Sequence, residues 1–434
     1  MSNSKSQLPS SSLYLPLTQG KTTPDWNQLG IEENLPTNSH YVKTQIDEAP
    51  VVRFVNQLIA DAVEQGASDI HLEPYEQHSR IRVRQDGVLQ CTYTPPNPVT
   101  RRLVSRFKIM AGMDIAEHRL PQDGRIKWQS LSNCVDLRIN SCPTLYGEKL
   151  VIRILDQSRQ QLQIEDLGLD SQQLAIFEHA LKQPYGMILV TGPTGSGKTV
   201  SLYAGLQRLN SESRNISTAE DPVEITLSGI NQVNINSKIG LSFAEALRSF
   251  LRQDPDVIMV GEIRDLETAQ IAIKAAQTGH LVLSTLHTND APASIARLQH
   301  MGVENYQIAS ALQLVIAQRL VRLLCAVCKQ SVSYPLPRLL AAGFAPDECK
   351  HLQLFRAHSC HLCLNGYKGR TGIYQLMPIT PELRDNIIHL SNSANNLTEQ
   401  FNQHKLPDLR HAGLEKVRQG LTSLEEVERM TREF

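Results

Sequence analysis

A short glycine-rich segment from Gly192 to Thr199 constrains the fold of this chain more than any other stretch. Its sequence, Gly-Pro-Thr-Gly-Ser-Gly-Lys-Thr, fits the phosphate-loop pattern. The apolar run 187–191 precedes it and is typical of a short buried strand, and leucines at 202, 206 and 209 follow at helical spacing. Strand, glycine loop and helix in this order predict an α/β fold organised around a bound nucleotide.

The loop offers donors that suit the phosphates of a nucleotide. Its glycines allow successive backbone N–H groups to point inward as an anion-binding nest, and the following helix adds a partial positive charge at its N-terminus. Lys198 is expected to reach the β and γ phosphates, and the Thr199 hydroxyl to hold Mg²⁺. The residues predicted to bind ATP are Gly192, Pro193, Thr194, Gly195, Ser196, Gly197, Lys198 and Thr199.

Three acids follow later strands and are candidates for the chemistry at the phosphates. Glu220 and Glu224 flank a proline turn at the end of a predicted strand, where paired acids suit Mg²⁺ binding or the positioning of water. The strand 257–260 ends in Gly261-Glu262, at a point where many phosphate-loop enzymes have Asp-Glu. Glu262 is expected to orient water, to accept its proton or to hold Mg²⁺ through water, and the sequence leaves these roles open.

One histidine and two arginines lie near the same predicted strand ends. His287 closes the strand 280–287 and suits a sensor of the γ-phosphate, although a lone histidine is more often structural. Arg248 and Arg252 lie four residues apart on a helix that a Ser242-x-x-Glu245 capping box begins. Because this helix directly precedes the strand that leads to Glu262, the two arginines are either part of the site or simple surface charges.

Two Cys-x-x-Cys pairs predict a structural metal site. Cys325 and Cys328 form one pair, and Cys360 and Cys363 form the other. Four thiolates at this spacing favour a closed tetrahedral zinc site, which leaves no open position for catalysis. Cys349 lies between the pairs and is not expected to bind the ion.

Length and charge narrow the class of protein. The chain has 434 residues, of which 41% are hydrophobic, so it can form two or three domains with sizeable cores. Its 43 basic and 44 acidic residues give a net charge of −1, which argues against a broad electrostatic grip on nucleic acid. No apolar run approaches the roughly 18 residues of a membrane span, and no signal peptide is visible. The chain is therefore expected in the cytosol, without direct membrane insertion.

Composition and periodicity divide the chain into segments. Residues 1–47 are polar and are expected to form a flexible tail. Residues 48–156 alternate helical and strand patterns and predict a small α+β domain. A glutamine-rich linker, 157–165, leads to an α/β domain, 166–434, which contains the cysteine insert 325–363 and C-terminal helices over 380–434. A Thr422-x-x-Glu425 capping box is expected to begin the last helix.

These motifs together resemble those of bacterial secretion ATPases, the motors of type II secretion and type IV pilus assembly. Four segments carry the resemblance in the α/β domain, as the phosphate loop, the aspartate box, the second ATPase motif and the histidine box: 192–199, 219–224, 252–265 and 278–290. Segments 67–71 and 121–125 match in the first domain. The resemblance covers about residues 48–434.

The resemblance implies a RecA-like motor domain, a PAS-like first domain and a ring of six chains. It implies that the ring lies on the inner face of the inner membrane, bound to a platform protein and other cytoplasmic assembly proteins. It also implies that Arg125 and Arg138 reach across to the nucleotide and that Arg248 and Arg252 assist. The alternative is that the first two arginines pair with acids of their own domain, such as Asp123 or Asp136. The cysteine insert is similar to that of the assembly and secretion branch, whereas the retraction branch lacks it.

Two other functions are compatible with the sequence. A nucleic-acid-translocating motor would share the phosphate loop, although the near-neutral charge and the cysteine insert speak against it. A nucleotide-gated scaffold that binds ATP but hardly hydrolyses it is favoured only by Gly-Glu in place of Asp-Glu. About 47 polar residues precede the first shared helix, where family members often carry a longer domain for membrane docking or cyclic-dinucleotide binding. Dinucleotide regulation is therefore not expected.

Overall fold

The structure is a computed structural model that describes residues 50–129, 134–156, 163–389 and 407–431. These residues belong to two compact units, Met1–Gln157 and Ser158–Phe434. The tail 1–47 and linker residues 157–162 lie outside the described residues, and the last linker residues enter a short 3-10 helix, η3 (Ile164–Leu167). Among the described residues, no helix has both the length and the apolar character needed to cross a bilayer.

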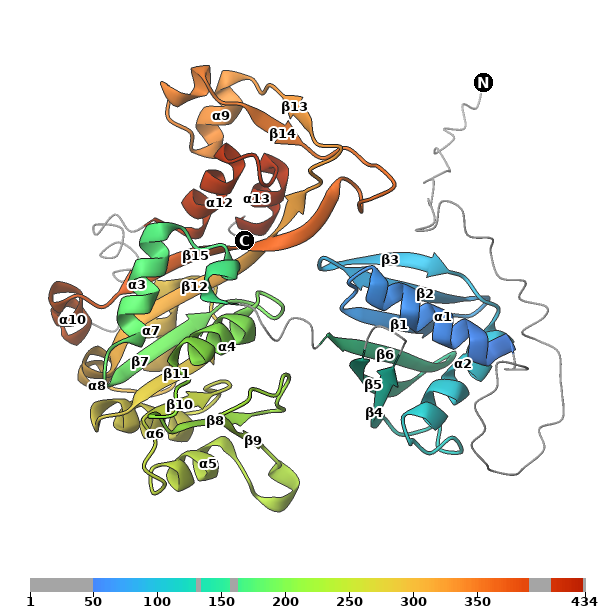
Figure 1. The fold of residues 1–434 in the computed structure, drawn as a ribbon, viewed down its shortest axis with the longest axis horizontal. Helices are drawn as coiled ribbons and strands as arrows, with labels where there is room; N and C mark the ends of the chain where they lie inside the picture. The colour runs from blue at the N-terminus through green and yellow to red at the C-terminus, as the bar shows by residue number, and fades with distance from the viewer. Residues whose placement is uncertain (1–49, 130–133, 157–162, 390–406, 432–434) are drawn as a thin grey trace, which may run out of the picture. The chain divides into compact units, whose positions relative to one another are not determined.

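The first unit is an antiparallel sheet with two helices on one face (Figure 1). Its strands, in the spatial order β3-β2-β1-β6-β5-β4, are β1 (Asp69–Pro74), β2 (Ser79–Gln85), β3 (Val88–Tyr93), β4 (Gln122–Gln129), β5 (Cys134–Thr144) and β6 (Gly147–Asp156). The helices are α1 (Pro50–Glu64) and α2 (Asn97–Met110). Alternate strand residues such as Leu72 and Ile152 pack with both helices into one core, so the other face of the sheet carries the polar side chains.

The second unit is a seven-stranded, mostly parallel sheet with helices on both faces (Figure 1). Its spatial order is β15-β12-β7-β11-β10-β8-β9, with β7 (Gly186–Thr191), β8 (Ile216–Glu220), β9 (Asn231–Asn234), β10 (Val257–Val260) and β11 (Leu281–Leu286) parallel to one another. Helices α3 (Ser171–Leu181) and α4 (Lys198–Leu209) bury one face. The other face packs against α5 (Phe243–Phe250), α6 (Leu266–Gln277), α7 (Ala291–His300) and α8 (Asn305–Ala311).

Two long strands complete the sheet and were not predicted from the sequence. β12 (Leu312–Leu324) runs parallel to β7, and β15 (Tyr367–Pro378) pairs antiparallel with β12. The cysteine insert connects these two strands as a small lobe with β13 (Gln330–Val332), α9 (Leu336–Ala342), η5 (Glu348–Lys350) and β14 (Leu354–Arg356). The lobe is therefore an excursion from a strand pair at the edge of the main sheet.

The chain ends in short helices, as expected, but the last cap differs from the prediction. α10 (Pro381–Ile388) is followed by α12 (Leu409–Arg418) and α13 (Leu424–Thr431). The Ser423 hydroxyl, rather than Thr422, accepts the backbone N–H of Glu426 at 3.2 Å. The Thr422 hydroxyl instead donates to the carbonyl of Arg322 in β12, so a tertiary contact shifts the cap by one residue.

Candidate functional site

The phosphate loop joins the end of β7 to the start of α4, as predicted. In the sheet, β7, β11, β10 and β8 are consecutive neighbours and all parallel, so the segments that follow them meet at one edge. The loop follows β7, Glu220 ends β8, Glu262 comes two residues after β10, and His287 directly follows β11. The fold thus brings the predicted acids and the histidine to the same sheet edge as the loop.

The strand β12 supports the loop from one side and explains two of its glycines. A Cβ at Gly192 would overlap the carbonyl oxygen of Gln318, and one at Gly197 would lie 2.8 Å from Gln318 Nε2. The Gln318 side chain in turn accepts a hydrogen bond from the Ser201 hydroxyl of α4 at 2.8 Å. A Cβ at Gly195 would meet no atom within 4 Å, so this part of the loop has open space beside it. Gln318 is a functional neighbour that local sequence patterns could not identify.

Two polar groups of the loop fit an anionic ligand. Lys198 is 9% exposed and its ammonium donates to the carbonyls of Gly192 and Pro193 at 2.9 and 3.1 Å. Burial lowers the pKa of Lys198, and the nearby charge of Glu262 acts in the opposite direction. The buried Ser196 hydroxyl has no hydrogen-bond partner among the described residues. A phosphate oxygen would supply an acceptor to both groups, so these residues fit a nucleotide.

Glu262 lies in a cluster of positive groups. One carboxylate oxygen pairs with Arg264, and the other lies 3.5 Å from His287 Nε2. Arg264 also contacts Asp221 of the aspartate box at 3.4 Å. Burial acts to raise the pKa of Glu262, but Arg264, His287 and Lys198 outweigh it, so the pKa lies below the ordinary carboxyl range. Glu262 is therefore ionised at neutral pH, as a water-orienting or proton-accepting group must be.

Arg264 contacts Glu262 but was not among the site residues expected from the sequence. Its position two residues after Glu262, within the second ATPase motif, was the available signal. The contact between Arg264 and Asp221 joins that motif to the aspartate box.

The two acids of the aspartate box differ sharply in their surroundings. Glu220 is 3% exposed and its carboxylate accepts from Tyr203, Thr218 and Gln232. Glu224 is exposed, and its carboxylate has no protein partner among the described residues. Only Glu224 therefore has oxygens available to a ligand in this arrangement.

Arg248 lies on α5, but Arg252 follows the end of that helix, so the two do not share one helix as expected, and both contact surface groups. Arg248 pairs with Glu245 and Glu267, each at 2.5 Å, and Arg252 donates to the carbonyl of Arg248 at 2.8 Å. The charge of these acids offsets that of Arg248. Within the second unit the structure does not bring either arginine to the phosphate loop.

The polar face of the first unit's sheet carries a row of arginines in register. Arg125 of β4 lies opposite Arg138 of β5, and Arg138 lies opposite Arg153 of β6. Asp69 of β1 comes next, 3.3 Å from Arg153 and 3.6 Å from Arg84. The row thus has four cations and one acid. Arg153, which the sequence did not single out, belongs to it.

One of the two acids expected as partners of these arginines, Asp123, has another hydrogen-bond partner. Asp123 accepts a hydrogen bond from Asn140 at 3.0 Å. Arg125 is exposed and makes no ion pair within the described residues. This weakens the alternative in which Arg125 serves only its own domain.

The four cysteines converge as predicted. Cys325, Cys328, Cys360 and Cys363 place their sulfur atoms within 4.8 Å of one another. Three of the sulfur pairs are 3.6 to 3.9 Å apart. Tetrahedral zinc with Zn–S bonds of about 2.3 Å requires sulfur atoms about 3.8 Å apart. The donor set and its spacing fit a zinc ion held by four thiolates, and Cys349 lies outside the cluster at the rim of the lobe's apolar core.

Comparison with known proteins identifies the family to which this chain belongs. The family model described as "Type II/IV secretion system protein" matches residues 44–429. The chain belongs to this family. The secretion ATPase is 56% identical to the type IV pilus assembly ATPase PilB of Acinetobacter baylyi over 89% of this chain and 67% of that protein. It is 46% identical to the type II secretion system ATPase E of Vibrio cholerae, over 93% of this chain and 79% of that protein.

A solved structure agrees with this assignment. The pilus retraction motor PilT, solved with bound ADP, has a TM-score of 0.60 and 26% identity, over 87% of this chain and 97% of that one. The fold class predicted from the sequence, a RecA-like phosphate-loop motor with a smaller α+β unit and a four-cysteine insert, is confirmed. By family and by its loop, the secretion ATPase is a phosphate-loop enzyme that acts on ATP.

The cysteine lobe of the secretion ATPase has a small core that it shares with the C-terminal helices. Leu339 and Phe344 of the lobe pack with Leu414 of α12 and Val427 of α13. Ion pairs reinforce this contact, since Arg418 of α12 binds Glu348 of the lobe at 2.9 Å. The terminal helices, for which the sequence suggested no role, therefore supply part of the lobe's core.

The purified secretion ATPase is expected to contain one zinc ion per chain. Because structural zinc contributes directly to folding, a strong chelator should lower the melting temperature. Cys325→Ser should lower both the zinc content and the melting temperature, whereas Cys349→Ser should leave the zinc content unchanged. Metal analysis with thiol titration checks this, and substoichiometric zinc with four freely titratable thiols would contradict the site.

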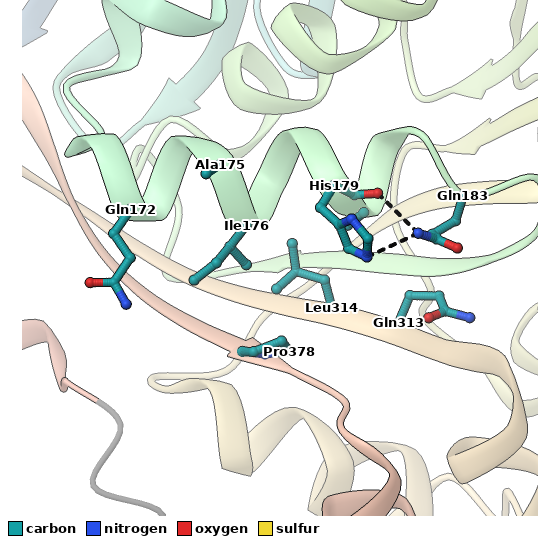
Figure 2. Close-up of a pocket in the computed structure, with 9 residues that line it drawn as sticks. Gln172, Ala175, Ile176, His179, Gln183, Gln313, Leu314 and Pro378 are labelled. Atoms are coloured by element: carbon teal, nitrogen blue, oxygen red, sulfur yellow. Dashed lines mark hydrogen bonds between the residues drawn. The ribbon is translucent and has the colours of Figure 1, made fainter.

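A separate cavity of about 320 Å³ lies beside α3 (Figure 2). Figure 2 shows it between the α3 side chains Gln172, Ala175, Ile176 and His179, Gln183 just after that helix, and the strand residues Gln313, Leu314 and Pro378. Gln313 packs against Gly186, the first residue of β7, whereas the phosphate loop follows the last residue, Thr191. The cavity therefore lies at the opposite end of β7 and is not the nucleotide site of the secretion ATPase.

Proposed function

We propose that this phosphate-loop ATPase works as a ring of six chains and couples ATP hydrolysis to the assembly of a type IV pilus or type II secretion pseudopilus. The observation that carries the proposal is the meeting of the phosphate loop with an ionised Glu262 at one sheet edge. The named relatives are a pilus assembly ATPase and a type II secretion ATPase, which supports this class of machine. The ring would work in the cytoplasm, on the inner face of the inner membrane, with a platform protein and other assembly proteins as partners.

The residues of the site divide the work of hydrolysis. The loop N–H groups and Lys198 would bind the phosphates of ATP. Mg²⁺, when bound, would neutralise charge on these phosphates and so favour attack of water on the γ-phosphorus. Thr199 and Glu224 are the side chains that would hold Mg²⁺, because a hydroxyl and a free carboxylate suit this ion. Glu262 orients the attacking water or takes its proton. His287 senses whether the γ-phosphate is present, through its contact with Glu262.

Arginines complete the site in this proposal. Arg125 and Arg138 supply guanidinium groups that bind phosphate oxygens in two-pronged hydrogen bonds and spread the charge of the transition state. Arg248 and Arg252 assist by pairing with acids or phosphates of a neighbouring chain in the ring. The register of Arg125, Arg138 and Arg153 on a helix-free sheet face supports a phosphate-binding role for this row.

Replacement of Arg125 or Arg138 by alanine is expected to lower ATP turnover by at least about tenfold, with a much smaller change in nucleotide affinity. Arginine fingers of other phosphate-loop enzymes contribute about 10³-fold or more in rate, which makes this a conservative expectation. Turnover and thermal stability are measured on the same preparations. Lys127→Ala is the matched control, because Lys127 is an exposed cation on the same strand and face as Arg125.

A different outcome would identify a structural role for these arginines. If substitution lowers the melting temperature but leaves the rate per folded ring unchanged, both arginines serve their own domain. An equal loss of rate in Lys127→Ala would show that the polar face of the sheet acts through its total positive charge and not through Arg125 or Arg138 individually.

A gene deletion in the organism that produces this protein tests which assembly machine the ATPase serves. Deletion of the gene should abolish surface pili, DNA uptake or enzyme secretion, and the trait that is lost identifies the system. Complementation with the parental gene should restore that trait, whereas Lys198→Ala should not. Mass measurement of the purified protein with Mg²⁺ and a non-hydrolysable ATP analogue should give six chains, and a stable monomer with full turnover would contradict the ring.

A further inference from the structure

The turn that carries Glu224 is held by side chains from other elements. After β8 the chain continues through this turn without regular secondary structure. Asn234 of β9 accepts the backbone N–H of Val223 at 2.7 Å. Gln232 of β9 accepts the backbone N–H of Leu227 at 2.7 Å. Side chains of β9 therefore help to hold the turn that carries Glu224.

Tyr203 holds the same turn from the side of the phosphate loop. It lies on α4, four residues after Thr199, and is 4% exposed. Its hydroxyl oxygen accepts the backbone N–H of Glu224 at 3.4 Å, and the hydroxyl donates to the carboxylate of Glu220. The phenol proton points to Glu220, which leaves an oxygen lone pair of Tyr203 for the backbone N–H of Glu224.

Glu220 is itself fixed by further donors. The Thr218 hydroxyl donates to it at 2.6 Å and the Gln232 amide at 3.1 Å. A buried carboxylate with three donors has one well-defined orientation, so it fixes the direction of the Tyr203 hydroxyl. A continuous chain of hydrogen bonds thus runs from the Glu224 backbone through Tyr203 to Glu220.

We infer that Tyr203 is a positioning residue that sets where Glu224 stands relative to the phosphate loop, with Glu220 as its anchor. The inference rests on the proposed function, in which Glu224 helps to hold Mg²⁺. Since α4 begins at Lys198 and Thr199, one helix then carries both the loop's phosphate and Mg²⁺ groups and the contact that orders the second acid. Glu220 acts through this chain and does not touch the ligand.

Tyr203→Phe is expected to lower kcat for ATP hydrolysis by about tenfold or more, because small displacements of a positioned group cost this much. KM for ATP should change little, and the Mg²⁺ concentration for half-maximal rate should rise. The phenyl ring keeps its packing, so the fold should survive. Tyr374→Phe is the matched control: Tyr374 is 2% exposed, belongs to the same apolar cluster, and donates to the carbonyl of Leu167 at 2.8 Å. It should alter thermal stability without altering kcat or the Mg²⁺ dependence.

The double variant decides whether Tyr203 acts through Glu224. If it does, Tyr203→Phe should cause little further loss in a Glu224→Gln background, because the group it positions is already disabled. Independent, multiplicative losses would overturn the inference, as would an unchanged rate in Tyr203→Phe alone or an equal loss in Tyr374→Phe. Parental protein that fails to hydrolyse ATP overturns both this inference and the proposed function, whereas active parental protein with an equally active Tyr203→Phe overturns this inference alone.

Discussion

Lys198→Ala is expected to abolish measurable ATP turnover while the fold survives. The ammonium of Lys198 is the cation of the loop, and loss of one such stabilising group typically costs about 10²–10³-fold in rate. Its hydrogen bonds to the carbonyls of Gly192 and Pro193 close the loop on itself, so removal should also weaken ATP binding. Turnover of the purified protein, measured by phosphate release, checks the prediction.

Thermal unfolding shows whether the loss of turnover is specific. Alanine at position 198 removes a partly desolvated charge from the protein, so the melting temperature should stay close to the parental value. Lys182→Ala is the control and should be fully active, since Lys182 is the C-cap residue of α3 and its side chain is 72% exposed. Hydrolysis by Lys198→Ala at the parental rate would remove the basis of the motor proposal.

Glu262→Gln is expected to bind ATP and to hydrolyse it about a hundredfold more slowly or worse. Glutamine keeps the shape of the side chain but loses the charge and basicity that orient water and accept its proton, and such groups contribute about 10²–10⁴-fold. The amide also weakens the pair with Arg264 and the contact with His287. Single-turnover hydrolysis and equilibrium binding of a fluorescent nucleotide separate the two effects.

The comparison variant for this experiment is Glu304→Gln. Glu304 is exposed at the start of α8 and its side chain caps no backbone group. This variant should be fully active. A slow Glu262→Gln would then show that the loss arises at position 262 and not from any exchange of glutamate for glutamine. Equal turnover in both variants would move the catalytic role to another acid, and Glu224 is the acid with free oxygens.

The parts of this fold that the sequence predicted are those governed by local chemistry. The glycine loop requires its own residues, and β7 and β10 beside it are short apolar runs. Asp290 directly precedes α7, and its side chain accepts the N–H of Ala293 at 2.7 Å, which is the contact that a helix-capping aspartate makes. The paired cysteines likewise reveal their site, because ligand spacing within each knuckle is set by the ion.

The parts that the sequence did not predict depend on contacts between distant residues. Residues 325–366 separate β12 from β15 along the chain, and no local pattern in either strand predicts that the two pair. The support of the loop by Gln318 and the burial of Glu220 under Tyr203 follow from that same tertiary packing. Sequence analysis could therefore place Glu220 and Glu224 in one motif but could not separate the buried acid from the exposed one.

The attachment of the cysteine lobe bears on how such proteins change in evolution. Leu324 and Tyr367 are direct partners in the strand pair, so the lobe leaves and re-enters the sheet about 5 Å apart, the spacing of neighbouring strands. Almost any compact insert has ends that meet this requirement, and its acquisition leaves the motor sheet intact. The lobe nevertheless shares its apolar core with α12 and α13, whose Leu414 and Val427 would face water without it. Lobe and terminal helices are therefore expected to be gained or lost as one heritable module, although the chain between them belongs to the motor.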